Sequence, residues 1–466
     1  MTRSLSSEFL PPVKEKKNKP KNKHESPLIL LELSKDLVEL ARIWHESKDN
    51  IAQNNFFDHV KVLRQGHPQF LSPFPSEITW TKALKPDTRR ISRYLKKIFS
   101  SRIFSNFGPF HEELEKRLRT YLKVENLFLV NNATIGLMLA LRFAYDKLRP
   151  KNPYIITTPF TFPATSHAVK FLSFDTAFAD IDPHSLCLCP EAVENVIKKH
   201  GPPVAVIPVH VFGNVADLEA FESLRRKYGF FLIYDSAHAF GVEVNGKGIG
   251  SYGDFSVFSL HATKIFHTAE GGIVTFSDPA YAKDLGYLRS FGIKGVDTCF
   301  SLGINAKLSE LNCALGLALW DKIEPAIKKR KQLYNIYAQE FSEVTYLHPV
   351  MRHLPAVRQN YGYATFLVSG HSFVTRDVLC DLLKKFNVIA RKYFSPLLSD
   401  VPCYKYDLEK FKPVLKTAED VSKKTITLPI YPDLNTGDIK KITQIVKYIF
   451  QASDIIKTSI NNKALG

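Results

Sequence analysis

FSVFSLHATKIFHTAEGG, residues 255–272, begins as an apolar strand and continues into a run of polar and small residues. FFLIYDSAHAFG, residues 230–241, has the same form, with an apolar stretch that ends in a polar turn. Strands that are apolar along their whole length are typical of a mainly parallel sheet covered on both faces. In open sheets of this kind ligands bind at the carboxyl ends of the strands. The residues that follow these two strands, Asp235–His238 and Ser259–Lys264, are therefore candidates for one shared site.

Strand-like and helix-like stretches alternate on both sides of these two segments. Apolar strands are predicted at 127–130, 154–157, 176–180, 204–212, 230–235 and 255–260. Amphipathic helices are predicted at 111–122, 131–148 and 216–229, and Asn132 is a candidate N-cap for the second of them. This alternation predicts an α/β fold with a large domain, whose mainly parallel sheet is flanked by helices. A helix-rich stretch at 307–342 and a second strand–helix region, with its clearest strand at 363–370, predict a smaller C-terminal α/β domain.

The chain has 466 residues, which is too long for a single core because cores stop growing at about 250–300 residues. Its 45% hydrophobic and 23% charged residues are typical of a soluble globular protein. KEKKNKPKNK at 14–23 predicts a solvated, disordered tail, and a helical pattern at 28–65 ends at a proline-containing linker. The expected division is a basic tail at 1–26, a helical extension and linker at 27–79, the large domain at 80–330, the small domain at 331–452 and a tail at 453–466.

The net charge of +17 predicts attraction to anions such as phosphorylated substrates. Basic and aromatic residues are not interleaved in any recognisable motif, so no nucleic-acid partner is expected. Among the six cysteines only Cys187 and Cys189 are close in sequence, which is not a zinc pattern, so we expect reduced thiols, no metal and a cytoplasmic location. We expect neither a signal peptide nor a transmembrane segment. A role for residues 1–79 in binding a membrane surface, a partner enzyme or RNA stays open.

The polar residues at the strand ends suit one kind of chemistry. Asn131–Thr134 lies between a strand and a helix, where free N–H groups and the helix dipole make an anion site suited to a phosphate. Asp235 could hold a protonated ring nitrogen, and Lys264 becomes a nucleophile for a carbonyl if burial disfavours its charge. A phosphate cradle, a buried aspartate and a nucleophilic lysine are the parts that pyridoxal 5'-phosphate (PLP) requires. Aspartate and lysine are common at loop ends, so these residues alone leave other chemistry open.

Longer motifs along the chain resemble, in order, the DegT-type family of sugar-nucleotide aminotransferases. They are SNFGPFHEELEKRLRTYL (105–122), NNATIGLMLAL (131–141), TTPFTFPAT (157–165), PVHVFGNVADLEAF (208–221), YDSAHAFG (234–241), FSLHATKIFHTAEGG (258–272), GINAKLSELNCALGLALWDKIEPAIKKR (303–330), IARKYFSPLL (389–398) and TLPIYPDL (427–434). The resemblance covers about 80–452 and implies the fold type I of PLP-dependent transferases, that of aspartate aminotransferase.

The resemblance also implies a role for each residue of the site. Lys264 would bind PLP covalently and move the proton during transamination, Asp235 would pair with the pyridinium nitrogen, and His238 would lie near the phenolic oxygen. The remaining cofactor ligands would be Ala133, Thr134 and Ile135 through their backbone, Ser259 through its hydroxyl, Phe162 as the ring that stacks on the pyridine, and Asn305 at the neighbouring subunit's phosphate. This last role implies a homodimer with shared active sites.

Some of these residues have other interpretations. Phe160 is an alternative stacking ring, a structural role stays open for His238, and Asn305 could cap a helix N-terminus. Arg391, Lys392 and Tyr393 are candidates for substrate contacts.

A lysine at position 264 favours amino transfer, because the dehydratase branch of the same family has histidine there. The resemblance therefore implies an aminotransferase that moves an amino group from an amino acid, glutamate in most members, to a nucleotide-linked keto-deoxy sugar. The expected acceptor is dTDP-4-keto-6-deoxyglucose, for polysaccharide or lipopolysaccharide biosynthesis, since the motifs at 131–141, 157–165 and 390–394 look like the branch that makes 4-amino-4,6-dideoxyglucose. A 3-keto sugar, a UDP-linked sugar and a cyclitol ketone stay open, as does a PLP-binding member with a regulatory rather than a catalytic role.

Overall fold

The computed structural model of the protein describes residues 73–464, apart from 296–297 and 371–373. The predicted basic tail and residues 27–72 of the predicted extension lie outside the described residues. Residues 73–457 form one compact unit that contains both predicted domains. The predicted domain boundaries stay predictions.

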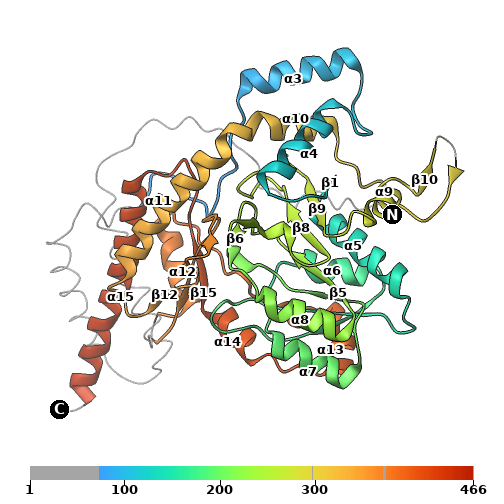
Figure 1. The fold of residues 1–466 in the computed structure, drawn as a ribbon. Coiled ribbons are helices and arrows are strands. Elements are labelled where there is room, and N and C mark those ends of the chain that lie inside the picture. Colours follow the sequence, from blue (N-terminus) through green and yellow to red (C-terminus); the bar gives the residue numbers. More distant parts are fainter. Residues whose placement is uncertain (1–72, 296–297, 371–373, 465–466) are drawn as a thin grey trace, which may run out of the picture. The chain divides into compact units, whose positions relative to one another are not determined.

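A seven-stranded sheet with the order β1-β9-β8-β5-β4-β2-β3 forms the centre of this unit (Figure 1). The parallel strand pairs are β2–β3, β2–β4, β4–β5 and β5–β8, whereas β9 runs antiparallel to both β1 and β8. The predicted α/β class with a mainly parallel sheet is therefore confirmed. The strands are β1 (Leu127–Val130), β2 (Tyr154–Thr157), β3 (Asp175–Phe178), β4 (Ala205–Ile207), β5 (Phe231–Asp235), β8 (Phe255–Ser259) and β9 (Gly272–Phe276).

Two features of the sheet differ from the sequence prediction. The strand predicted at 204–212 ends at Ile207, because Pro208 has no N–H to donate to a neighbouring strand and the chain then turns into the short helix η1 (Val211–Gly213). The antiparallel strand β9 was not predicted. It inserts between β1 and β8, with Gly272 opposite both Val130 and Ser259.

Helices cover both faces of the sheet. One cluster of buried side chains joins the sheet to α5, α6 and α9, a second joins it to α7, α8, α13 and α14, and a third joins β1, β9 and β8 to α4 and α10. The predicted N-cap is confirmed, since Asn132 Oδ1 accepts a hydrogen bond at the start of α5. The helices are α3 (Thr88–Ser101), α4 (Pro109–Tyr121), α5 (Ala133–Leu148), α6 (Ala164–Phe171), α7 (Pro190–His200), α8 (Leu218–Tyr228), α9 (Tyr281–Arg289) and α10 (Glu310–Leu319).

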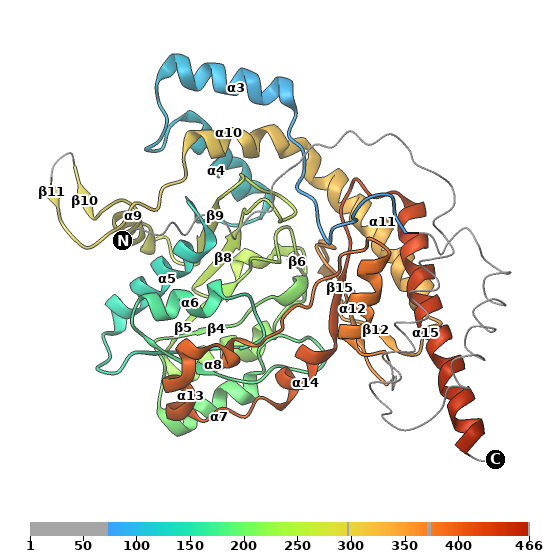
Figure 2. The same ribbon diagram turned by 180° about the vertical axis from the view of Figure 1, so that it is seen from behind.

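A second, smaller α/β layer follows, as predicted. The antiparallel sheet β12-β14-β15 lies with α12 and α15 beside the large sheet, and α11 leads the chain from one to the other (Figure 2). Its elements are α11 (Ile323–Phe341), β12 (Leu347–Pro349), β14 (Ala364–Val368), α12 (Arg376–Lys385), β15 (Thr425–Leu428) and α15 (Thr436–Ala464). None of the helices in the described ranges has the length and apolarity that a bilayer crossing needs.

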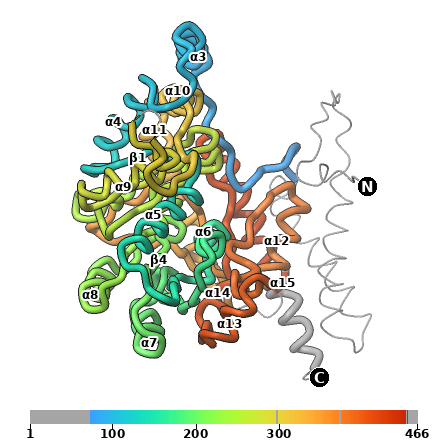
Figure 3. Tube along the Cα trace, turned by 90° about the vertical axis from the view of Figure 1, so that its right-hand side faces the viewer, coloured from blue at the N-terminus to red at the C-terminus, as the bar shows by residue number. Residues whose placement is uncertain are grey.

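The segment 398–424 leaves the small sheet and returns to the large one. It contains η4 (Leu398–Asp400), η5 (Pro402–Tyr404), α13 (Lys405–Phe411) and α14 (Lys416–Lys424), and Figure 3 shows α13 and α14 near α7. Buried Asp407 accepts hydrogen bonds from the Thr176 N–H at 3.0 Å and from Lys170 Nζ at 2.8 Å. Asp180 accepts the N–H groups of Thr417 and Ala418, each at 2.9 Å. These bonds fix 398–424 to the edge of the large sheet.

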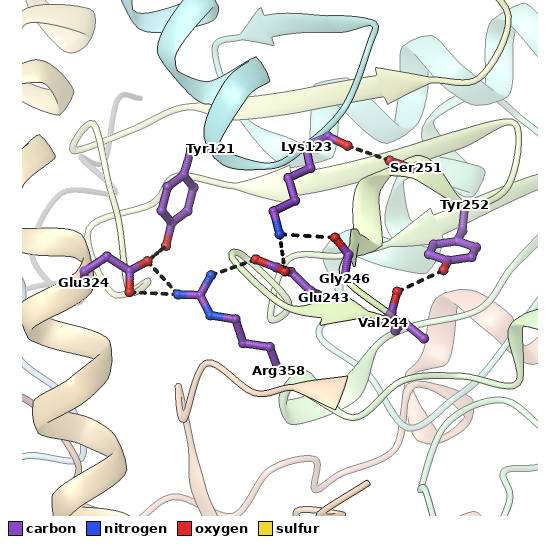
Figure 4. Close-up of polar contacts among 9 residues, drawn as sticks. All are labelled: Tyr121, Lys123, Glu243, Val244, Gly246, Ser251, Tyr252, Glu324 and Arg358. Atoms are coloured by element: carbon purple, nitrogen blue, oxygen red, sulfur yellow. Dashed lines mark hydrogen bonds and ion pairs between the residues drawn. The ribbon is translucent and has the colours of Figure 1, made fainter. Parts of the chain in front are cut away.

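A small sheet of the order β13-β6-β7 links the two layers at another place. Its strands are β6 (Glu243–Val244), β7 (Lys247–Gly248) and β13 (Val357–Arg358). The Arg358 guanidinium donates to Glu243 at 2.8 Å and to both carboxylate oxygens of Glu324 on α11, at 2.6 and 2.8 Å (Figure 4). Lys123, which follows α4, pairs with the same Glu243, and the Tyr121 hydroxyl donates to Glu324. Two carboxylates and two cations thus balance each other around β13.

Between β7 and β13 in the chain, β10 (Ile293–Lys294) and β11 (Thr298–Cys299) form a separate hairpin.

Candidate active site

Four strands and one helix bring their ends to the same edge of the large sheet. Gly272, the first residue of β9, lies between Val130 at the end of β1 and Ser259 at the end of β8. Asp235 ends β5, the next strand, and is paired with Val257 of β8. Because β9 is antiparallel, its amino end meets the carboxyl ends of its neighbours, which is where ligands bind in open α/β sheets.

The N-terminus of α5 offers backbone donors to an anion at this edge. Asn132 Oδ1 accepts the N–H of Ile135 at 2.8 Å, so the N–H of this predicted phosphate ligand is already engaged. Among the described residues, the N–H groups of Ala133 and Thr134 have no hydrogen-bond acceptor. These two donors at a helix N-terminus are the ones left for a phosphate.

Gly272 allows this helix end to approach the sheet. A Cβ atom at position 272 would lie 2.6 Å from the carbonyl carbon of Asn132 and 2.7 Å from the nitrogen of Ala133. Any larger residue would therefore displace the first turn of α5. Ser259, directly opposite Gly272 on β8, is buried, and its Oγ accepts the His261 N–H at 3.3 Å.

Asp235 is a buried carboxylate held by two neutral donors. Thr165 Oγ1 donates to Oδ2 at 2.7 Å and the Ala237 N–H donates to Oδ1 at 3.0 Å. Burial raises the pKa of Asp235, against the opposing effects of these hydrogen bonds and of the Lys264 charge. A cationic ring nitrogen in contact with this carboxylate would stabilise its charged form.

His238 is held as a neutral imidazole. Its Nδ1 accepts the N–H of Phe212 at 3.1 Å, and burial lowers its pKa well below the usual value. Since Nδ1 is an acceptor in the neutral ring, the proton lies on Nε2, which can donate to a ligand oxygen. The ring also stacks on Phe394, with 6.1 Å between centroids, so a structural role and a ligand contact are compatible here.

Lys264 lies in the turn after β8, partly buried, with its N–H bonded to the His261 carbonyl at 2.9 Å. Burial lowers its pKa to about 8, although the Asp235 carboxylate opposes the shift. Its Nζ lies 3.1 Å from the hydroxyl of Tyr363, a residue that sequence reasoning missed. Tyr363 stands directly before β14 in the predicted strand 363–370, and no local pattern could connect it with a lysine so distant along the chain.

Phe162 and Asn305 lie outside this group of contacts within the single chain. The Phe162 side chain is 57% exposed, whereas the alternative stacking ring, Phe160, is buried in the core against Phe212 and Phe394. Asn305 is exposed, and α10 is capped by Ser309, so the N-cap interpretation of Asn305 is wrong. Both predicted contacts would need a bound cofactor or a second subunit.

The candidate substrate contacts at 391–393 separate into two groups. Lys392 forms an ion pair with Asp377 at 2.7 Å. The exposed Arg391 guanidinium lies over the rings of Trp80 and Tyr393, at 5.5 and 5.9 Å from their centroids. The Tyr393 ring lies 6.4 Å from that of Tyr363, the tyrosine that contacts Lys264, so Tyr393 is on the active-site side and Arg391 packs against it.

These observations fit PLP. Two unpaired N–H groups at a helix N-terminus suit its phosphate, a buried carboxylate suits its ring nitrogen, an imidazole Nε2–H suits its phenolic oxygen, and a lysine with a lowered pKa suits its aldehyde. The strands β9 and β8 lie between β1 and β5, so the phosphate donors after β1 and the carboxylate at the end of β5 are separated along the same edge of the sheet.

Comparison with known proteins agrees with this geometry. The model of the DegT/DnrJ/EryC1/StrS aminotransferase family matches residues 86–447. Two proteins described as dTDP-4-amino-4,6-dideoxy-D-glucose transaminase, from Shigella dysenteriae and Escherichia coli, are 33% and 34% identical to this chain, over 78% of it and 96% and 97% of their own lengths. The structure of DesI in the presence of its TDP-sugar product is similar with a TM-score of 0.75 at 27% identity, covering 84% of this chain and 97% of DesI. Helicobacter pylori PseC, an aminotransferase of pseudoaminic acid biosynthesis, has a TM-score of 0.73 at 25% identity, covering 81% of this chain and all of its own.

Replacing Gly272 by alanine should weaken cofactor retention. The new Cβ would push the Asn132–Ala133 backbone away and move the two free N–H donors. We expect the Kd for PLP, measured by fluorescence titration of the apoenzyme, to rise about tenfold or more, the equivalent of one lost charge-assisted hydrogen bond. Gly286→Ala on α9 is the matched control, since no atom lies within 4 Å of its added Cβ. Equal PLP affinity for the two variants would contradict the proposed cradle.

The rate at which the apoenzyme captures PLP covalently should depend on the protonation of Lys264. Only the neutral amine attacks an aldehyde, so the rate should rise with pH and level off above about 8, the lowered pKa of this side chain. Borohydride reduction at timed intervals, followed by peptide mass spectrometry, measures the capture. A rate that keeps rising to about pH 10, where an ordinary lysine titrates, would show that burial does not activate Lys264.

Proposed function

The chain belongs to the DegT/DnrJ/EryC1/StrS aminotransferase family, and on this premise we propose that its acceptor is dTDP-4-keto-6-deoxyglucose and its amino donor glutamate. It is a PLP-dependent aminotransferase of sugar nucleotides. The finer proposal is supported by the two relatives at 33% and 34% identity, whose described substrate is the 4-amino-4,6-dideoxy sugar linked to dTDP. The keto form of that sugar is what the amino group is transferred to in the forward direction.

When bound, PLP supplies an electron sink that stabilises the negative charge left on carbon after a proton is removed. The chain's own residues would hold it and move the proton. Asp235 would keep a proton on the ring nitrogen. A protonated ring and an ionised Asp235 carboxylate attract each other, which offsets the effect of burial on the carboxylate. His238 would donate through Nε2 to the phenolic oxygen.

The phosphate would bind to the Ala133 and Thr134 N–H groups and to the Ser259 hydroxyl. Phe162, whose ring is exposed in the single chain, would cover one face of the pyridine. Lys264 Nζ would hold the cofactor covalently until the amino donor displaces it. The released amine would then take the proton from the donor's α-carbon and give a proton to the aldehyde carbon of the cofactor. For this, Nζ must lose and regain a proton easily near neutral pH, which its lowered pKa allows.

The homodimer with shared sites is part of the proposal. Asn305 is exposed, and large apolar side chains close to it in sequence are exposed as well: Phe291, Phe300, Leu302 and Ile304, between 37% and 62%. Apolar side chains gathered in this way are typical of a surface that another protein covers. A second copy of this chain is the proposed occupant, and its Asn305 would reach the phosphate of the first.

The substrate proposal is tested by incubating the holoenzyme and glutamate with a panel of keto sugar nucleotides and weighing the products by mass spectrometry. We expect an aminated dTDP-linked 4,6-dideoxy sugar, and none from Lys264→Ala, because that variant lacks the atom that moves the proton. Amination of UDP- or GDP-linked sugars alone would contradict the proposed acceptor, and turnover only with another amino acid would contradict the donor.

Shared sites predict complementation between two inactive variants. Lys264→Ala and Asn305→Ala should each be inactive or nearly so, but mixed subunits should regain up to about a quarter of the wild-type rate, since a heterodimer has one intact site. The control mixture is Lys264→Ala with Asp235→Ala, whose defects lie in the same chain's site and cannot complement. A monomer by light scattering, or no regain in the first mixture, would contradict the shared site.

A further inference from the structure

The segment 357–363 joins β13 to β14 and places the side chain of its last residue, Tyr363, beside the catalytic lysine. It begins at β13, where Arg358 is fixed between Glu243 and Glu324 (Figure 4). It ends at Tyr363, which directly precedes β14 of the small sheet. The position of Tyr363 is therefore set by contacts on both sides of it.

Asn360 fixes the middle of this segment. Its buried side-chain amide donates to the carbonyl of His238 at 2.9 Å and to that of Phe240 at 3.0 Å, and its Oδ1 accepts the Gly362 N–H at 3.0 Å. One side chain thus ties the loop that follows Asp235 and bears His238 to the residue next to Tyr363. From the other side, buried Arg330 donates to the carbonyls of Gly362 and Ile430, at 3.4 and 2.6 Å.

Tyr363 itself lies among the residues of the site. Its ring centroid is 4.5 Å from that of His238 and 5.6 Å from that of Phe212, and its hydroxyl is 3.1 Å from Lys264 Nζ. The side chain is buried, at 7% exposure, and burial raises its pKa, so it is a neutral phenol near neutral pH.

A phenol is suited to a lysine that changes its protonation state. A hydroxyl group can both donate and accept a hydrogen bond, whereas an ammonium group only donates and a neutral amine can accept. The same contact therefore persists when Nζ is –NH₂, accepting from the hydroxyl, and when it is –NH₃⁺, donating to its oxygen. A carboxylate in this place would favour the ammonium form alone and would raise the pKa of the lysine.

We propose that Tyr363 is a further catalytic residue. Its hydroxyl holds the released Lys264 amine between the two carbons that exchange the proton, the donor's α-carbon and the aldehyde carbon of the cofactor, while the amine is neutral and while it is protonated. This inference rests on the amino transfer proposed above. Nζ takes a proton from the donor's α-carbon, keeps its contact with the hydroxyl as an ammonium group, gives a proton to the second carbon and becomes a neutral amine again. Tyr363 ends with the proton it began with, so the step needs no further reactant.

The test is Tyr363→Phe in the holoenzyme, because phenylalanine keeps the ring contacts and removes only the hydroxyl. We expect the rate of the half-reaction with the amino donor to fall about tenfold or more, which corresponds to the loss of one hydrogen bond to a group that becomes charged. The KM for the donor should change by less than about twofold, since the hydroxyl contacts the lysine. The isotope effect with α-deuterated donor should increase as proton transfer becomes slower.

Tyr361→Phe is the matched control. Tyr361 lies two residues away, is equally buried at 7% exposure and packs against Tyr334 rather than against Lys264. This variant should keep the wild-type rate and isotope effect. An unchanged rate and isotope effect in Tyr363→Phe, or equal losses in both variants, would overturn the proposal.

A second readout does not depend on amino transfer. The apoenzyme of Tyr363→Phe should capture PLP through Lys264 several-fold more slowly than wild type, because the amine is no longer oriented. If wild type fails with every amino donor but this difference in capture is present, the proposed function is wrong, and only the part of the inference in which Tyr363 orients the Lys264 amine stands. Equal capture rates would remove that role whatever the enzyme does with donors.

Discussion

A lysine amine and a buried carboxylate that share one edge of a sheet determine what this molecule can do. Burial works against the charged form of each, so it lowers the pKa of Lys264 and raises that of Asp235, while their mutual attraction opposes both effects. Among the described residues, Asp235 has only neutral hydrogen-bond donors and Lys264 has one hydroxyl as its partner, so neither group is fully satisfied there. A ligand that brings a cation to the carboxylate and an aldehyde to the amine answers both needs at once. Asp235 ends β5 and Lys264 lies in the turn that follows β8, so the pairing of β5 with β8 brings the two groups to the same edge of the sheet.

Much of this arrangement was predictable from local patterns. The strands β1, β5 and β8 end within one residue of the predicted positions, and Asn132 is the cap that its position before an apolar helical face indicated. The polar residues after each strand consequently fell at one edge of the sheet, which the rule for open α/β sheets requires. The candidate site was in this sense a consequence of fold class together with the residue types at strand ends.

What could not be predicted depends on pairing between distant segments. The antiparallel insertion of β9 places Gly272 against the first turn of α5, and a glycine pair in a loop gives no sign of its partner. Tyr363 reaches Lys264 because of contacts at Arg358 and Asn360, none of which leaves a periodic pattern. The engaged N–H of Ile135, by contrast, was predictable from the local N-cap, since the side chain that starts the helix uses one of the donors expected to hold a phosphate.

The return of residues 398–424 to the large sheet limits how the enzyme can open. The chain passes between the two layers in α11, again at 389–398, and again between α14 and β15, and the bonds to Asp180 and Asp407 pin the middle of this path. A clamshell movement about one linker would have to break them together. The two layers are therefore held to each other at several places along the chain, and access to the site has to come from rearrangements smaller than a separation of the layers.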